Sequence, residues 1–324
     1  MMAKISFRET ETKPVPKYRF LQLDVFTDHA FGGNPLAVFP EAEGITDDEM
    51  QQIAREMNLS ETVFVLPSNE ERALRRLRIF TPARELPFAG HPVVGTWYAL
   101  ALEGIVSLPE GGSGLVRIEH ELGIGVLPVE IEFQNNEPVR VVMTQGQFEI
   151  VKEVADKDAR GRIARAIGLS VDDLNERLPV QAISTGNSML IVPVRSLEAL
   201  GRCSVDAAGL VEAYRSASAT GCYAFTFETK EDNAAHARFF VPDLGMMEDP
   251  ATGSAAGPLG GYLVHHGALS IDPEYGVYRF VIEQGDFMNR PSRIHLEVTG
   301  TRGNVEQVRV AGSSVLVARG KLIF

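Results

Sequence analysis

The sequence contains two weakly similar halves, and a duplication of this kind requires both halves to adopt one fold. The segment RIFTP, which begins at Arg78, returns as RFFVP from Arg238. Further along, ELPFAGH from Glu85 returns as EDPATGS from Glu248. Because the matched segments keep their order, we interpret the chain as two copies of one structural unit.

The separation between the copies grows along the chain, from 153 residues for Asn34 and Asn187 to 169 residues near the C-terminus. Insertions in loops cause a drift of this kind. A chain of 324 residues also suggests two domains, at about 150 residues each. We therefore predict an N-terminal lobe over residues 1–147 and a C-terminal lobe over residues 148–324.

Each half has one long segment that is apolar nearly all round, which is typical of a buried helix. These segments predict helices over residues 91–103 and 252–265. Short alternating strands with connections of hairpin length surround them, and such connections favour antiparallel pairing. We expect an α+β fold of two pseudo-symmetric lobes. Each lobe would be a mostly antiparallel, curved sheet around its central buried helix, with an active site in the cleft between them.

The net charge and the number of cysteines indicate which binding partners and which cellular compartment fit this protein. The formal net charge of -12 disfavours nucleic acids and anionic membrane surfaces as partners. Two cysteines, Cys203 and Cys222, indicate neither a disulfide framework nor a zinc site, and we predict a cytoplasmic protein. No apolar run is long enough for a signal peptide or a membrane span. Residues 1–17 are charged, and nothing in them indicates a role.

Both predicted central helices begin directly after a turn that contains proline and glycine. The first N–H groups of a helix lack partners within it, so a helix start is a natural anion site. We expect Gly90 in the first half, and Gly253 and Ser254 in the second, to bind a substrate carboxylate. The alternative is that the turns only begin the helices.

The two copies differ in their polar residues at these turns. When they are aligned on the proline of each turn, His91 in the first copy corresponds to Ser254 in the second. Asp249 in the second copy corresponds to Leu86 in the first. If the two turns only began the helices, their polar residues would not need to differ in this way. The pattern therefore favours a specialised polar cleft between the lobes.

Glu61 is a third candidate, because it lies at the entrance of a predicted strand between apolar neighbours. At the matching position of the second half the chain has Gly221, so this carboxylate belongs to one half only. Removal from water would raise its pKa toward neutrality, as general acid/base chemistry requires. The alternative is an ordinary surface glutamate.

Motifs for common cofactors are absent from the sequence. It has no GxxxxGK[ST] phosphate loop, HExxH metal motif, GxSxG nucleophile elbow or complete dinucleotide fingerprint. The histidines are scattered along the chain. We therefore expect no metal and no cofactor.

Three ordered segments carry a family resemblance: NLSETVF from Asn58, FTPARELPFAGHP from Phe80 and EDPATGSA from Glu248. Together they resemble the PhzF-like isomerases of phenazine biosynthesis, which have the diaminopimelate-epimerase fold. The resemblance implies two similar lobes, a cofactor-free active site between them and a homodimer.

The resemblance also implies roles for individual residues. Glu61 would be the acid/base, His91 and Asp249 polar residues of the pocket, and Gly253 with Ser254 a carboxylate cradle. In the family's chemistry a carboxylate moves a proton on the ring of 2,3-dihydro-3-hydroxyanthranilate. Racemases of this fold instead use two opposed cysteines, and the matching turns of this chain have none.

These observations predict a cofactor-independent isomerase that shifts a proton on a small cyclic carboxylic acid, in a biosynthetic process. The alternative is a non-catalytic protein of the same fold that binds small carboxylates or has a regulatory role.

Overall fold

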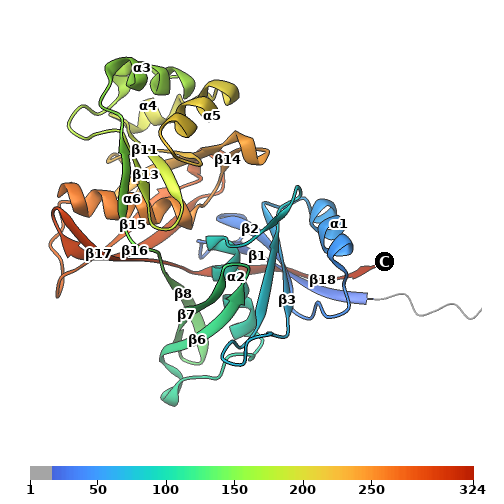
Figure 1. Ribbon diagram of the computed structural model, residues 1–324. Coiled ribbons are helices and arrows are strands. Elements are labelled where there is room, and N and C mark those ends of the chain that lie inside the picture. The colour runs from blue at the N-terminus through green and yellow to red at the C-terminus, as the bar shows by residue number, and fades with distance from the viewer. Residues whose placement is uncertain (1–16) are drawn as a thin grey trace, which may run out of the picture.

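The computed structural model describes residues 17–324, so the first sixteen residues of the charged N-terminal segment lie outside the described residues. The described chain forms two lobes (Figure 1). No helix in this part of the chain has the length and apolar character needed to cross a membrane.

The first half of the chain supplies most of the N-terminal lobe. Its elements are β1 (Lys17–Val25), β2 (Asn34–Phe39), α1 (Asp47–Met57), β3 (Glu61–Leu66), β4 (Arg76–Phe80), β5 (Glu85–Leu86), α2 (Gly90–Leu102), η1 (Glu110–Gly112), β6 (Gly114–Leu122), β7 (Gly125–Gln134) and β8 (Glu137–Thr144).

The second half begins with β9 and adds three outer helices, α3 to α5, to the same plan. Its elements are β9 (Glu149–Glu153), α3 (Lys157–Ala166), η2 (Val171–Asp173), β10 (Gln181–Ser184), β11 (Ser188–Pro193), α4 (Leu197–Gly201), α5 (Ala207–Ser216), β12 (Cys222–Thr226), β13 (Ala235–Val241), η3 (Pro242–Leu244), β14 (Met246–Asp249), α6 (Gly253–His266), β15 (Val277–Gln284), η4 (Asp286–Met288), β16 (Ser292–Thr301), β17 (Asn304–Gly312) and β18 (Ser314–Ile323).

The two halves repeat one order of elements, which confirms the predicted pseudo-symmetric α+β fold. Strands β1 to β9 correspond to β10 to β18, and the central helix α2 corresponds to α6. Pairing is mostly antiparallel, and the parallel pairs recur in both halves: β2 with β3 and β11 with β12, β4 with β6 and β13 with β15.

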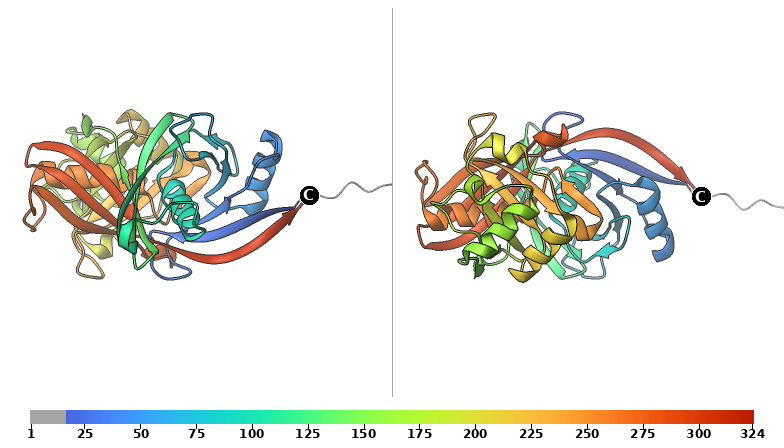
Figure 2. Two further views of the ribbon diagram at one scale, coloured as in Figure 1. Left: turned by 90° about the horizontal axis from the view of Figure 1, so that it is seen from below. Right: turned by 90° about the horizontal axis from the view of Figure 1, so that it is seen from above.

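The lobes are joined by the sheet and by an exchange of strands. Strand β8 pairs with β17 across the junction. Strand β9 is the last strand of the first repeat, but it lies beyond the predicted boundary at residue 148 and pairs with β10. Strand β18, the last strand of the second repeat, pairs with β1. Figure 2 shows β18 running beside β1. A cut at residue 148 would therefore separate β1 from its partner β18.

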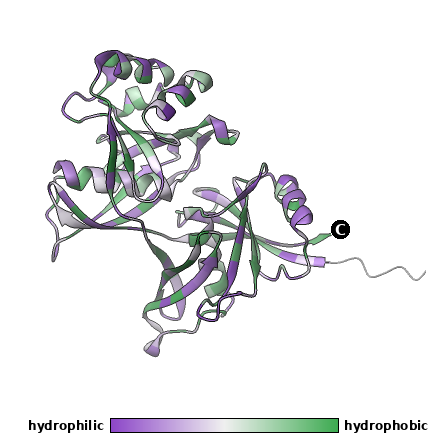
Figure 3. Cartoon of the chain, in the orientation of Figure 1, coloured by the Kyte–Doolittle hydropathy of each residue, from purple (hydrophilic) through white to green (hydrophobic). Residues whose placement is uncertain are grey.

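Both central helices are enclosed by strands, while the outer helices α1 and α3 are largely hydrophilic (Figure 3). In α2, the side chains of Val93, Val94 and Trp97 are fully buried. Leu259 and Leu263 of α6 are buried in the same way. Burial on all sides explains why these helices are apolar around their whole circumference.

The hairpin before each central helix is held by the same kind of ion pair. Arg78 on β4 donates two hydrogen bonds of 2.7 Å to the Glu85 carboxylate on β5. In the second lobe Arg238 binds Glu248 in the same bidentate way, at 2.9 and 2.6 Å. Bidentate pairs restrain orientation as well as distance, so each pair fixes the direction in which the chain enters the central helix.

Gly95 of α2 tests how closely the central helix and its sheet are packed. A Cβ atom there would lie 2.6 Å from methyl groups of both Leu36 and Val25. We expect Gly95→Ala to lower the free energy of unfolding by about 1–3 kcal/mol, because the buried side chains would have to move. Urea denaturation followed by circular dichroism measures this change.

Gly161 of α3 is the matched control, since a Cβ atom there meets neighbours only at 3.4 Å or more. Gly161→Ala should raise the free energy of unfolding by up to about 1 kcal/mol, the helix preference of alanine over glycine. Equal stability of Gly95→Ala and the wild type would contradict the close packing of α2.

Candidate active site

One pocket of about 350 Å³ lies where the two central helices begin, and residues from both halves of the chain line it. The structure brings together there all six residues singled out from the sequence: Glu61, Gly90, His91, Asp249, Gly253 and Ser254. They come from the first residue of β3, the first turn of α2, the last residue of β14 and the first turn of α6.

Glu61 enters the pocket through the register of parallel strands. Leu36 of β2 is opposite Glu61 of β3, and in the second lobe Leu190 of β11 is opposite Cys222 of β12. Leu36 corresponds to Met189, which lies one residue before Leu190. The position opposite Met189 is therefore Gly221, one residue before Cys222, and Gly221 matches Glu61. The pseudo-symmetric scaffold therefore carries this carboxyl on one side only.

The Glu61 carboxyl is almost completely removed from water, with 9% of the residue exposed. Burial raises its pKa well above 4.5, and the negative charge of Asp249 adds to the shift. A carboxyl with a raised pKa can take up and release protons closer to neutral pH, as an acid/base must.

His91 is a neutral neighbour of this carboxyl. Burial lowers the pKa of His91 to about 3, and its Nε2 lies 3.2 Å from Glu61 Oε2. On the other side of the ring the Asn34 amide nitrogen lies 3.3 Å from Nδ1. The same amide nitrogen lies nearer to Asp249 Oδ1 and to the Ala251 carbonyl, at 2.8 and 3.0 Å, so its two hydrogens face three acceptors.

Asp249 is the second buried carboxyl of the pocket. Burial raises its pKa to about 6, although hydrogen bonds from the Thr252 hydroxyl and the Asn34 amide favour the charged form. The Asn34 nitrogen lies 2.8 Å from Asp249 Oδ1. Asn34 therefore links Asp249 of one half to His91 of the other.

A further layer holds the turn between Asp249 and Thr252. Gln284 of β15 donates to the Asp249 carbonyl at 2.8 Å and accepts from the Thr252 N–H at 3.2 Å. The Tyr223 hydroxyl donates to the Gln284 side chain at 2.8 Å. These bonds set the direction of the Asp249 side chain.

The helix starts themselves are open toward the pocket. Ala89 precedes α2 and Thr252 precedes α6, and neither side chain caps its helix. A Cβ atom at Gly90 would lie 3.4 Å from the Ser254 amide nitrogen, so the two starts adjoin. Free N–H groups and the positive ends of two helix dipoles together favour a bound anion.

Sequence reasoning missed the supporting and wall residues of this site. Asn34 was visible as part of a repeated Gly-Asn pair, which is the signal that could have identified it. The apolar walls had no such signal, because apolar residues at these positions resemble any other core residue. They are Leu86, Phe88, Met189, Phe239, Val241 and Met246.

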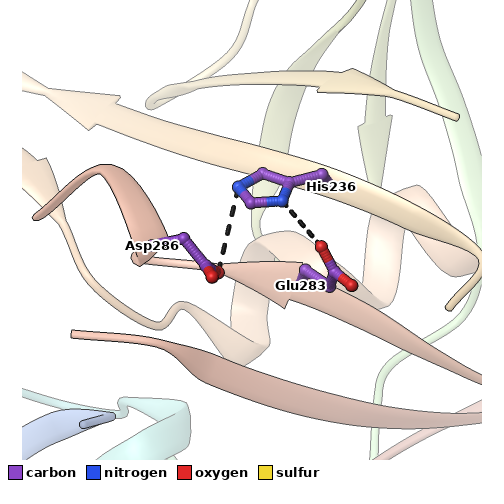
Figure 4. Close-up of side chains that lie close together, drawn as sticks. All are labelled: His236, Glu283 and Asp286. Carbon is purple, nitrogen blue, oxygen red and sulfur yellow. Dashed lines mark hydrogen bonds and ion pairs between the residues drawn. The ribbon is translucent and has the colours of Figure 1, made fainter. Parts of the chain in front are cut away.

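A second polar cluster lies in the C-terminal lobe, where strand pairing brings His236 close to Glu283 and Asp286 (Figure 4). Burial raises the pKa of Glu283, but hydrogen bonds, first from His236 and then from the Lys230 N–H, bring it down to about 2. Arg293 lies 3.1 Å from Asp286. Since these donors and this cation already occupy the carboxylates, the cluster fits a structural network better than a cation site.

The pocket thus combines two open helix starts with a buried carboxyl, in a fold of two pseudo-symmetric lobes. The family model described as "Phenazine biosynthesis-like protein" matches residues 23–320, and the chain belongs to this family.

Relatives are similar along almost their entire length. An isomerase of Clostridium acetobutylicum, described as uncharacterized, is 35% identical over 95% of this chain and 99% of its own. The trans-2,3-dihydro-3-hydroxyanthranilate isomerase of Pseudomonas chlororaphis is 34% identical over 94% of this chain and 99% of its own. The solved PhzF-family structure from Bacillus anthracis is 30% identical, with a TM-score of 0.81 over 95% of this chain and all of its own. The protein is an isomerase of this family.

The buried carboxyl predicts a pH-dependent gain of stability in Glu61→Gln. The pKa of Glu61 is raised in the folded state, so the folded protein holds more protons than the unfolded chain and loses stability as pH rises above about 4.5. Glutamine does not titrate. We expect the variant to exceed the wild type in free energy of unfolding at pH 8 but not at pH 4. The difference should be about 1.4 kcal/mol for each unit of pKa shift.

Urea denaturation at a series of pH values measures this difference. Glu56→Gln, an exposed position on α1, should follow the wild type at every pH. Parallel curves for Glu61→Gln and the wild type would contradict the burial of a titrating carboxyl in the pocket.

Proposed function

We propose that the protein catalyses a cofactor-independent proton shift on a small cyclic carboxylic acid, similar to the reaction of trans-2,3-dihydro-3-hydroxyanthranilate isomerase. The observation that carries the proposal is the position of Glu61, a buried carboxyl with a raised pKa beside two open helix starts. The similarity to the Pseudomonas chlororaphis isomerase supports the same reaction class.

In this proposal the substrate carboxylate binds the N–H groups of Gly90, Gly253 and Ser254. Anion binding at two helix starts would place the ring of the substrate between the apolar walls, next to Glu61. The helix dipoles hold the carboxylate without a metal ion.

Glu61 then acts as general base and general acid in turn. Its carboxylate removes a proton from a ring C–H bond, and the electron pair of that bond spreads over the conjugated system. The protonated Glu61 returns the proton to another carbon of that system, so no electrons are lost and the carboxylate is restored. The neutral His91 ring lies 3.2 Å from the Glu61 carboxyl, and Asp249, whose pKa is about 6, exchanges hydrogen bonds with the polar groups of the substrate.

The alternative of a non-catalytic carboxylate-binding or regulatory protein would be favoured by a Glu61 that points into solvent. Glu61 instead lines the pocket and is nearly buried. Its position therefore favours catalysis.

The proposal retains three further expectations. The boundary between the lobes stays at residues 147 and 148, with the proposed active site in the cleft between the two lobes. Two free, buried cysteines, Cys203 and Cys222, fit a cytoplasmic protein. Family membership supports a homodimer.

Isotope exchange tests the acid/base role. Wild-type protein treated with a chelator and incubated with 2,3-dihydro-3-hydroxyanthranilate in D₂O should form product and take up deuterium at a ring carbon, measured by proton NMR. Glu61→Gln should fold and lose about 10²–10⁴-fold in turnover, whereas Glu56→Gln should match the wild type. Unchanged turnover in Glu61→Gln would refute the role of Glu61. Ligand binding without conversion by the wild type would support the non-catalytic alternative.

The coupling between the two buried carboxyls predicts a shift in the pH profile. Because the charge of Asp249 raises the pKa of Glu61, Asp249→Asn should lower the apparent pKa of the acid limb of kcat/KM. The remaining activity, measured from pH 4 to pH 9, should thus persist to lower pH than in the wild type. An acid limb at the wild-type position would show that the two carboxyls titrate independently.

A further inference from the structure

The ionisable side chains that line the candidate active site differ in whether they are neutral, paired with an opposite charge, or charged without such a partner. Burial raises the pKa of both Glu61 and Asp249, which favours their neutral forms. The third lining carboxylate, Asp243, lies 2.9 Å from Arg215 outside the pocket. Among the described residues that line the pocket, Arg84 is the one lysine or arginine, so the permanent positive charge of this wall comes from its side chain.

The backbone of Arg84 is held in place by a tight turn. Its N–H donates to the Thr81 hydroxyl at 3.0 Å, and its carbonyl accepts from the Thr81 N–H at 2.9 Å. The neighbouring carboxylate, Glu85, is already bound twice by Arg78. Within residues 17–324 no carboxylate lies within ion-pair distance of the Arg84 guanidinium, which is therefore free to bind a ligand.

The second lobe adds hydrogen-bonding groups to the same pocket. Asn187 and Thr220 both line it, and the Thr220 hydroxyl lies 2.9 Å from Asn187 Oδ1. This contact orients the amide of Asn187, whose Nδ2 makes no hydrogen bond to the described chain. An amide N–H is a donor, so it suits the same kind of ligand group as a guanidinium does.

We propose that Arg84 binds a second carboxylate, so that the pocket prefers a cyclic dicarboxylic acid to a monocarboxylate such as 2,3-dihydro-3-hydroxyanthranilate. This inference rests on the proposed function, because the first carboxylate is the one held at the helix starts by Gly90, Gly253 and Ser254. A guanidinium matches the planar fork of a carboxylate. A pocket of about 350 Å³ accommodates one small ring with its substituents.

The overall charge of the molecule opposes the binding of a dianion, since the chain carries a formal net charge of -12. A dicarboxylate therefore needs local positive groups in the pocket. The two open helix starts and the Arg84 guanidinium, which has no ion-pair partner among residues 17–324, supply such groups. A monocarboxylate would use only the helix starts.

Isothermal titration of the full chain with aromatic acids tests the proposal. The probes are benzoate, the dicarboxylates isophthalate and terephthalate, and the matching carbamoylbenzoates, in which a neutral amide replaces the second carboxylate. The wild type should bind at least one dicarboxylate about tenfold tighter than its carbamoyl counterpart, since charge-assisted hydrogen bonds are the stronger kind. The preference should weaken as salt is added.

Variants assign this preference to Arg84. Arg84→Gln should bind a dicarboxylate and its carbamoyl counterpart equally and leave benzoate affinity unchanged. Arg72→Gln is the matched control, because Arg72 is exposed, lies outside the pocket and should keep the wild-type ratio. A wild type without preference for dicarboxylates, or an Arg84→Gln variant that retains it, would overturn the proposal.

The readout is a ratio of affinities and needs no turnover. Failure of the proton shift would appear instead as absent deuterium exchange, whatever Arg84 binds. The two proposals can therefore fail separately.

Discussion

Two helix starts without side-chain caps meet at one pocket of this protein. Free N–H groups inside a protein are costly unless an anion or a side chain satisfies them, and neither Ala89 nor Thr252 caps its helix. A Cβ atom at Gly90 would lie 3.4 Å from the Ser254 amide nitrogen, so the two starts adjoin, whereas Gly253 packs against Phe26. The bidentate Arg–Glu pairs orient the hairpins before the helices, and the pairing of β9 with β10 and of β18 with β1 holds the lobes together. These features keep the two helix starts beside one pocket.

Duplication supplied a symmetric scaffold, and divergence made its chemistry asymmetric. The strand register that places Glu61 in the pocket has Gly221 at the matching position of the second half. His91 and Ser254 occupy equivalent helix starts, so one lobe presents an imidazole and the other a small hydroxyl. A single buried carboxyl then lies beside two open helix starts, one from each half of the chain. The proposed proton shift by one carboxyl is consistent with this asymmetry.

The site combines catalytic potential with a cost in stability. Glu61 and Asp249 are buried close together, and the pKa of each is raised because neither charge is well solvated. His91 remains neutral beside them and contacts the Asn34 amide. An ion pair would keep the carboxylate charged and lower its pKa. A neutral imidazole instead leaves the pKa of Glu61 high enough for the carboxyl to give a proton back.

The duplication, the two buried helices and the six residues of the pocket could be predicted from the sequence, because they depend on local patterns and on comparison of the halves. The pairing of β18 with β1 and the contacts of Asn34 with both His91 and Asp249 could be seen only in the folded chain. The same holds for the lack of an ion-pair partner for Arg84 among residues 17–324. The histidines are scattered in sequence, yet pairing of β13 with β15 brings His236 to a carboxylate. Such contacts join residues tens to hundreds of positions apart. They depend on strand order and lobe packing, which no local pattern of side chains records.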